Sequence, residues 1–276
     1  MGANEMLLRD ALTGRNRDNA VISVKFGVMR DPAGGVSGID NRPASIKNFL
    51  TYSLRRLGTD HIDVYRPSRL SPEVPIEDVV GTLAELVQAG YIRHIGLSEV
   101  GAETLRRAVA VHPISDLQIE YSLVSRGVED EILPTARELG VGVTAYGVLS
   151  RGLISGHWTK ENAGRPDFRS HLPRFSGENL DQNLALVEEL RRIAHGKGVT
   201  VAQVAIAWVL SRGTDIVPLV GARRRDRLSE ALGAFDVILT DADLAAIQAA
   251  VPADAVAGTR YDAFQMSILD SERRVS

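Results

Sequence analysis

The stretch Val21-Ile-Ser-Val-Lys-Phe26 has the apolar alternation of a short β-strand, and an amphipathic helix is predicted after it, over residues 44–57. The chain repeats this unit of strand and helix six times before it reaches Gly221. Strands that alternate with helices in this way form a parallel sheet covered by helices. We therefore predict an α/β fold of the TIM (β/α)8 barrel type, in which only six of the eight units are legible.

The remaining elements follow from the same apolar periods. Strands are predicted over residues 62–66, 92–98, 117–121, 141–146 and 216–220. Helices are predicted over residues 76–89, 102–110, 127–139, 180–197 and 201–211, and an opening helix is capped by Asn4. A loop of about 15 residues is predicted after Phe26, and residues 151–179, which lack helical period, are interpreted as a flap over the site.

Composition limits the domain organisation and the partners. The 276 residues contain no linker rich in Pro, Gly or Ser, so a single domain over residues 1–276 is predicted. The 32 basic and 35 acidic residues give a net charge of −3, which provides no basic field for nucleic acid or an anionic membrane and favours a small-molecule partner. Because the sequence has no cysteine and begins without a basic and apolar leader, a cytoplasmic protein is expected. The composition leaves the oligomeric state open.

Lys25 lies within the first predicted strand, on the same side as Val21 and Ser23, and this side is expected to face the barrel interior. A buried ammonium is costly unless it is paired or its pKa is lowered, and lysines of that kind are often catalytic. A lysine that reaches solvent at the tip of a strand is the alternative. Because the carboxyl ends of all strands meet on one face of a barrel, Lys25 is a candidate catalytic residue.

Polar side chains also end three later strands, namely Ser98 with the adjacent Glu99, Gln118 and Tyr146. Amides and hydroxyls at strand ends can hold a flat heteroaromatic ligand that carries a carboxamide, and a tyrosine ring can stack on such a ligand. For each residue alone, a satisfied hydroxyl, a satisfied amide or a tyrosine at the core edge is the alternative. Their shared position at strand ends favours a binding site.

The segment Gly221-Ala-Arg-Arg-Arg-Asp-Arg227 follows the last predicted strand and opens a helix that continues through Leu232. Helix amino termini and arginines both bind phosphate, and barrels often hold a phosphate group after their final strands. A solvated basic face is the alternative. The sequence contains no GxGxxG, Walker, HExxH or GxSxG motif, so it does not support nucleotide binding of the doubly wound or P-loop kind.

Five segments spread over nearly the whole chain carry a resemblance to a known family. They are Thr59-Asp-His-Ile-Asp-Val-Tyr65, Gly90-Tyr-Ile-Arg-His-Ile-Gly-Leu-Ser-Glu99, Leu117-Gln-Ile-Glu-Tyr-Ser122, Thr144-Ala-Tyr-Gly-Val-Leu-Ser-Arg-Gly152 and Val217-Pro-Leu-Val-Gly-Ala-Arg-Arg224. In this order they resemble the aldo-keto reductase family. The resemblance implies an eight-stranded barrel that binds NADP(H) in extended form and uses no metal. It also implies an oxidoreductase that reduces an aldehyde or ketone to an alcohol by hydride transfer.

The resemblance implies roles for individual residues. Lys25 matches the family's catalytic lysine, which tunes the proton donor. The positions that hold the nicotinamide carboxamide are matched by Ser98, Glu99 and Gln118, and the tyrosine that stacks on the nicotinamide ring is matched by Tyr146. Further cofactor-binding positions are matched by Leu149 and Arg151 in the pyrophosphate loop, by Gly221, and by Arg223, Arg227 and Glu230 at the 2′-phosphate and the adenosine.

The family's active site uses Asp, Tyr, Lys and His, and of these four Lys25 is the one matched in this sequence. Ser68 occupies the histidine position, and Gly2-Ala-Asn-Glu5 resembles the segment just after the tyrosine. We therefore expect that Met1 is an internal methionine or the start of a shortened gene model, and that a longer chain supplies the remaining strands. Weak activity is expected of the chain as written, because loss of a general acid costs about 10² to 10⁴ in rate.

Two other functions are consistent with these residues. A barrel that binds NADPH without catalysis, as a subunit or a sensor, shares every cofactor position. A phosphate-binding barrel enzyme of another chemistry, such as an isomerase, keeps only the arginine segment and the topology. The sequence does not identify the carbonyl substrate.

Overall fold

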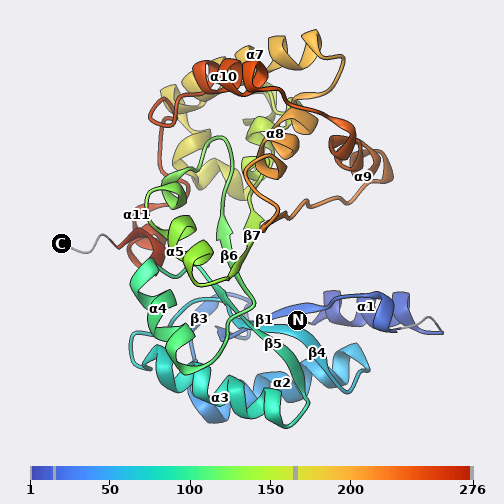
Figure 1. Ribbon diagram of the computed structural model, residues 1–276, viewed down its shortest axis with the longest axis vertical. Helices are drawn as coiled ribbons and strands as arrows, with labels where there is room; N and C mark the ends of the chain where they lie inside the picture. Colours follow the sequence, from blue (N-terminus) through green and yellow to red (C-terminus); the bar gives the residue numbers. More distant parts are fainter. Residues whose placement is uncertain (1, 15–16, 164–166, 274–276) are drawn as a thin grey trace. The chain divides into compact units, whose positions relative to one another are not determined.

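The computed structural model describes residues 2–14, 17–163 and 167–273. The chain divides into two compact units, and Figure 1 shows the ribbon with its helices and strands labelled. The first unit comprises residues 1–118 and 135–141, and the second comprises residues 119–134 and 142–276. The single domain over residues 1–276 stays a prediction.

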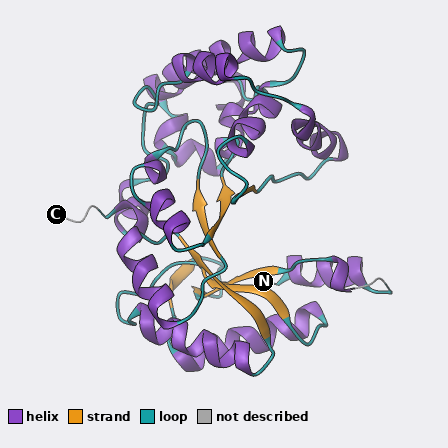
Figure 2. Ribbon diagram, in the orientation of Figure 1, coloured by secondary structure: helices purple, strands orange, loops and turns teal. Residues whose placement is uncertain are grey.

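Six strands form one hydrogen-bonded sheet in the order β1-β4-β5-β6-β7-β8, and they are drawn in orange in Figure 2. Their bounds are β1 (Ser23–Phe26), β4 (Ile62–Pro67), β5 (Ile92–Ser98), β6 (Asp116–Glu120), β7 (Gly142–Tyr146) and β8 (Ile216–Pro218). The pairs β1-β4, β4-β5, β5-β6 and β7-β8 are parallel. Consecutive parallel strands that neighbour one another require crossover connections, which are helical here. All six predicted strands are therefore present.

In the first unit, helices α1 (Ala3–Leu12), α2 (Pro43–Leu57), α3 (Ile76–Gln88) and α4 (Ala102–Val111) alternate with the strands (Figure 1). Helix α3 buries Ile76, Val79, Leu83 and Leu86, which recur at the helical period that predicted them. Helix α1 buries no residue, and its N-cap is Gly2 rather than the predicted Asn4. The buried helix faces of this unit therefore belong to α2, α3 and α4, which contact one another in sequence order, while α1 contacts α2.

Strand β1 shows the predicted alternation. Its side with Ile22, Val24 and Phe26 is buried, whereas the side with Ser23 and Lys25 is exposed. The side that was expected to face a barrel interior is thus exposed, and β1 stands at one end of the strand order. Phe26 stacks on Tyr65 of β4, with ring centroids 4.5 Å apart, which fixes β1 against its neighbour.

The segment after Phe26 is a β-hairpin rather than the predicted loop. Strands β2 (Val28–Arg30) and β3 (Val36–Ile39) pair antiparallel, with a register shift between Met29 and Arg30. Gly34, with φ of 89°, supplies the left-handed residue of the connecting turn. The prediction was wrong because the strands are short and because the Pro and Gly residues between them are equally typical of loops.

The second unit contains most of the later helices of the chain. Their bounds are α6 (Lys160–Ala163), α7 (Gly177–Gly196), α8 (Val201–Leu210), α9 (Arg225–Leu232), α10 (Asp241–Ala250) and α11 (Ala263–Ser267), and α5 (Ile132–Glu138) has residues in both units. Helix α8 is buried over nearly its whole length and contacts α7, α9 and β8. Thr200 begins α8 with a capping box to Gln203. The core of this unit therefore centres on α8.

The segment 151–179 contains short helical turns: η3 (Ser150–Ser155), α6, η4 (Phe168–His171) and η5 (Pro173–Phe175). Residues 164–166 of this segment lie outside the described residues. Trp158 is buried edge-on against Phe175, with ring centroids 5.3 Å apart, and the Arg169 guanidinium lies 3.9 Å from its ring centroid. The described part of the segment is thus anchored by aromatic packing that the lack of helical period did not reveal.

Among the described residues, no single helix is both long enough and apolar enough to cross a membrane. Helices α7 and α8 meet that criterion as a pair, and they are bent by 87° at the break between them. Most of α8 is buried inside the second unit.

Candidate functional site

Four predicted site residues meet at the strand ends of the first unit, and we refer to Lys25, Ser98, Glu99 and Gln118 as the strand-end cluster. Ser98 of β5 and Gln118 of β6 are register partners, and the Glu99 N–H donates to the Gln118 carbonyl oxygen at 3.0 Å. Lys25 reaches from β1 and donates its Nζ–H to Gln118 Oε1. The parallel sheet therefore gathers residues that are separated by as many as 93 positions.

The electrostatic surroundings of Lys25 lower its pKa to about 8. The largest cause is burial, which disfavours the charged ammonium, and the positive charges of Arg66 and Arg69 act in the same direction. Glu99 opposes them. Lys25 is exposed as a whole residue, but its hydrogen bond to Gln118 is partly buried. The ammonium group at the end of the side chain is therefore less accessible to water than the residue as a whole. Lys25 can therefore exchange a proton near neutral pH.

Ser98 and Glu99 combine burial with an unusual backbone. Both residues are buried to 1% exposure, and within the described residues Ser98 Oγ has no hydrogen-bond partner. Glu99 adopts φ of 56°, in the left-handed region that a residue with a Cβ rarely occupies. Buried polar atoms without partners and strained residues concentrate at functional sites. The end of β5 therefore has the features of a ligand-binding edge.

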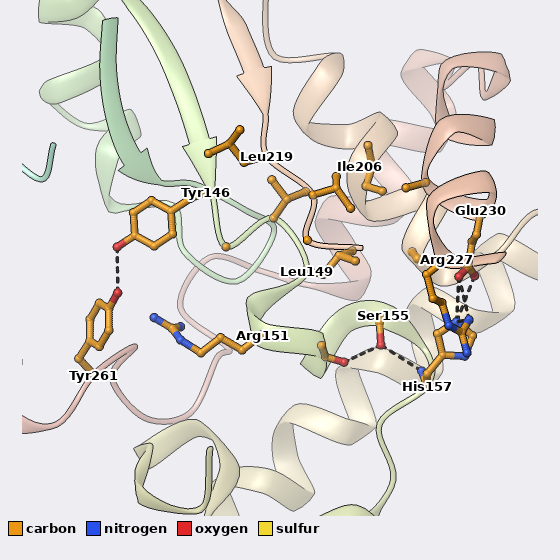
Figure 3. A pocket seen from close by; sticks show the side chains of 17 residues that line it. Tyr146, Leu149, Arg151, Ser155, His157, Ile206, Leu219, Arg227, Glu230 and Tyr261 are labelled. Atoms are coloured by element: carbon orange, nitrogen blue, oxygen red, sulfur yellow. Dashed lines mark hydrogen bonds and ion pairs between the residues drawn. The ribbon is translucent and has the colours of Figure 1, made fainter. Parts of the chain in front are cut away.

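A pocket of about 530 Å³ lies in the second unit, within the size range of small-molecule sites. Its lining includes six predicted cofactor-binding residues: Tyr146, Leu149, Arg151, Gly221, Arg227 and Glu230. Figure 3 shows Tyr146 and Tyr261 at one end of the pocket and Arg227, Glu230 and His157 at the other. Arg223, which lies in the loop before α9, is not among the residues that line it.

The loop after β7 carries backbone strain. Gly147 has φ of 67°, and a Cβ there would lie 2.9 Å from Glu120 Cγ, so the position requires glycine. Ser150 and Arg151 adopt φ of 45° and 56° without being glycine. With Glu99, these are the non-glycine residues of positive φ among the described residues. All three therefore lie at or beside positions that the sequence predicted for cofactor binding.

The buried carboxylate of Glu120 was missed by the sequence analysis. Its side chain is fully buried, and Arg151 Nη2 lies 3.2 Å from Oε2. The nearest guanidinium nitrogens of Arg174 and Arg260 each lie 3.6 Å from the carboxylate, and the Ser125 hydroxyl donates to it at 2.9 Å. We call Glu120, Arg151, Arg174 and Arg260 the Glu120 cluster. The alternation of β6, which places Glu120 on the same side as Gln118, is the signal that could have identified it.

Tyr146, which ends β7, is held by hydrogen bonds at its hydroxyl group. The Tyr261 hydroxyl lies 3.0 Å from it, and Arg260 Nη1 donates to it at 3.2 Å. The Arg151 guanidinium lies over the Tyr261 ring, 4.5 Å from its centroid. The tail residues Arg260 and Tyr261 therefore fix the orientation of the Tyr146 ring beside the pocket.

The arginine segment opens α9 as predicted, but its members are not equivalent. Arg224 donates from Nε and Nη2 to the two carboxylate oxygens of Asp226, at 2.9 and 2.7 Å. Arg227 donates to Glu230 Oε2 at 2.8 Å and lines the pocket. Burial works to raise the pKa of Glu230, but hydrogen bonds from Arg227, Thr200 and His157 outweigh it and lower that pKa. Arg227 is therefore the arginine of this segment that faces a ligand space.

The residues of this pocket could hold a phosphorylated dinucleotide. At one end a guanidinium can pair with a phosphate group and a carboxylate can accept from an adenine amino group, and at the other end a tyrosine ring offers a stacking face. Ser150 Oγ, in the strained loop, is buried and has no hydrogen-bond partner among the described residues. The roles of the individual site residues stay predictions.

Comparisons with known proteins identify the family. The model of the "Aldo/keto reductase family" matches residues 1–252. A curated relative named "Probable aldo-keto reductase 1" from Glycine max is 40% identical over 259 residues, which cover 94% of this chain and 75% of the relative. The solved structure of the glycerol dehydrogenase AKR11B4 from Gluconobacter oxydans matches with a TM-score of 0.84 and 31% identity, over 92% of this chain and 79% of that one.

These matches confirm the resemblance and the fold class. Members of this family have the TIM barrel fold, and the six-stranded sheet of this chain is part of that α/β class. The matches also support an oxidoreductase that acts on carbonyl compounds. The chain belongs to the aldo/keto reductase family.

Proposed function

We propose that this protein is an NADP-dependent oxidoreductase that reduces a small-molecule aldehyde or ketone to an alcohol by hydride transfer, in the cytoplasm and without a nucleic-acid or membrane partner. The observation that carries the proposal is the pocket of the second unit, where Arg227 and Glu230 lie at one end and Tyr146 at the other (Figure 3). Family membership supplies the reaction class.

Different residues would bind different parts of the cofactor. Arg227, with Arg223 nearby in sequence, would hold the 2′-phosphate, and Glu230 would accept from the adenine. Leu149, Arg151 and Gly221 would flank the pyrophosphate. Tyr146 would stack on the nicotinamide ring. The carboxamide group of the nicotinamide would bind to Ser98, Glu99 and Gln118. When bound, NADPH supplies the hydride.

Lys25 assists proton transfer to the carbonyl oxygen in this proposal. Reduction of a carbonyl consumes one proton for each hydride, so a group near the carbonyl oxygen must hold or deliver it. Lys25 Nζ is oriented by Gln118 Oε1, and its lowered pKa of about 8 places its titration near the working pH. Lys25 would therefore favour proton delivery, directly or by tuning a neighbouring donor.

Ser68 supports a second candidate function, which is binding of NADPH without turnover. Ser68 follows β4 at the position that matches the family's histidine, and its N–H donates to the Phe26 carbonyl oxygen at 2.8 Å. A serine hydroxyl cannot carry a second proton near neutral pH as an imidazole can. A chain with an intact cofactor pocket and this substitution suits a sensor or a regulatory subunit.

Fluorescence titration with NADPH and NADH tests the cofactor assignment. We expect NADPH to bind at least about 10-fold more tightly than NADH, because a guanidinium paired with phosphate contributes about 1.5 to 3 kcal/mol. Equal affinity for the two, or binding of neither, would contradict the proposal.

Turnover then separates the two candidate functions. The assay follows oxidation of NADPH with a panel of aldehydes and ketones, and includes glyceraldehyde because the structural neighbour is named a glycerol dehydrogenase. If the protein is a reductase, Lys25→Met should lower kcat by about 10² or more while NADPH affinity changes little. Lys47→Met, at an exposed lysine paired with Glu85, is the matched control and should leave kcat unchanged. Tight NADPH binding without turnover of any substrate would favour the non-catalytic candidate.

A further inference from the structure

His157 lies at the adenosine end of the pocket, in the turn that follows η3 (Figure 3). The Ser155 hydroxyl donates to the Gly152 carbonyl oxygen at 2.7 Å and accepts from the His157 N–H at 3.2 Å. Arg191 of α7 donates to the Gly156 carbonyl oxygen at 3.1 Å. The backbone of His157 is therefore fixed, and its half-exposed imidazole points at α9.

His157 forms a triad with Arg227 and Glu230. Its Nε2 lies 3.1 Å from both carboxylate oxygens of Glu230, and Arg227 Nη1 lies 2.8 Å from Oε2 of the same carboxylate. Arg227 Nη1 also contacts His157 Nε2. Two groups that can donate thus converge on one carboxylate and touch each other.

The hydrogen-bonding capacities of these groups cannot all be satisfied together. The Arg227 guanidinium can only donate hydrogen bonds. His157 Nε2 donates a hydrogen bond when it carries a proton and accepts one when it does not. If Nε2 is protonated, it donates to Glu230 and faces an N–H of Arg227. If Nε2 is unprotonated, it accepts a hydrogen bond from Arg227, and no hydrogen then lies between Nε2 and the carboxylate oxygens of Glu230. In each state one of the two contacts is unfavourable.

A phosphate group beside Arg227 would remove this conflict. Arg227 could turn its guanidinium to the phosphate, and His157 would remain as the hydrogen-bond donor of Glu230. We propose that His157 is a specificity-determining residue for NADPH over NADH, which acts by holding Glu230 while Arg227 binds the 2′-phosphate. This inference rests on the proposed function.

Several charged groups surround the contact between His157 and Glu230. They are Arg227 and Glu230 of α9 and Arg191 of α7, and the Thr200 hydroxyl before α8 also bonds to Glu230. If Arg227 turns to a phosphate group, His157 and Thr200 remain as the side chains that hold the Glu230 carboxylate in place.

The test is isothermal titration calorimetry with 2′,5′-ADP and 5′-AMP, which differ by the 2′-phosphate. His157→Ala should weaken 2′,5′-ADP by about 3- to 10-fold and leave 5′-AMP within about twofold, since one net hydrogen bond is lost. His157→Gln, whose amide can still donate to Glu230, should retain wild-type affinity within about twofold at about pH 8. Circular dichroism melting confirms that the variants fold.

Rescue by His157→Gln distinguishes this role from a structural one. The amide of His157→Gln keeps the hydrogen bond to Glu230, so this variant should retain the affinity for 2′,5′-ADP that His157→Ala loses. Equal loss of both ligands in His157→Ala, or the same loss of 2′,5′-ADP affinity in both variants, would overturn the inference alone. If the wild type binds neither ligand, the inference and the proposed function both fail.

Discussion

The strand-end cluster of the first unit and the Glu120 cluster of the second both hold cations, but they compensate the charge differently. Lys25 bonds to a neutral amide, with two arginines nearby, and its pKa falls to about 8. Arg151 bonds to a buried carboxylate, and although burial works to lower the pKa of Arg151, Glu120 together with Tyr261 and Tyr146 outweighs it and raises that pKa. The first cluster therefore suits proton exchange, whereas the second suits a permanent charge beside a ligand.

The largest effect that this comparison predicts is the loss of the Glu120 carboxylate. Glu120→Gln should lower the free energy of unfolding by about 3 to 5 kcal/mol, because the three arginines around it lose their buried counter-charge. Urea denaturation measures this. Glu189→Gln, at an exposed residue paired with Arg192 in the same unit, is the control and should cost about 1 kcal/mol or less. Equal costs for the two variants would show that the Glu120 cluster is not a buried charge network.

The second prediction concerns the cation that faces the pocket. Arg227→Ala should weaken NADPH binding by about 10- to 100-fold and change NADH binding by less than about threefold, because the phosphate loses a charged hydrogen-bond donor. Arg192→Ala, at an exposed arginine of α7 outside this pocket, is the matched control. A similar loss for both cofactors would place the 2′-phosphate elsewhere.

The smallest predicted effect is on the titration of Lys25. NMR of protein labelled with ¹³C and ¹⁵N at lysine should show a midpoint near pH 8 for the signal that disappears in Lys25→Met. Because the pKa of Lys25 in the folded protein lies below its ordinary value of 10.5, the unfolded chain binds more protons between about pH 8 and 10.5, and stability should rise with pH across that window. A midpoint near 10.5 would show that the Nζ group is fully solvated.

The sequence predicted those features that depend on the regular recurrence of apolar residues within one helix or strand. The apolar residues of α3 recur every three to four positions, and the strand ends at Ser98 and Gln118 meet because β5 and β6 are neighbours. The hairpin of β2 and β3 was missed because its strands are short and its turn residues also suit a loop. Prediction was therefore reliable where one buried face sets the pattern.

The parts of the site that were missed depend on contacts between distant segments. Glu120 is neutralised by arginines from η3, η5 and the carboxyl-terminal tail, and no local period reports such an arrangement. His157 lies in a segment without helical period, so its approach to Arg227 and Glu230 of α9 is visible in three dimensions alone. The fold was therefore needed to find the partners of Glu120 and His157.

The central claim is that the pocket of the second unit holds the adenosine part of NADP(H). Hydrogen–deuterium exchange with and without NADP⁺ tests it most directly, because it reports which backbone segments the cofactor protects. The account predicts slower exchange over residues 147–157 and 221–231, which contribute most of the lining of this pocket. Saturating NADP⁺ that leaves both segments unprotected would contradict it.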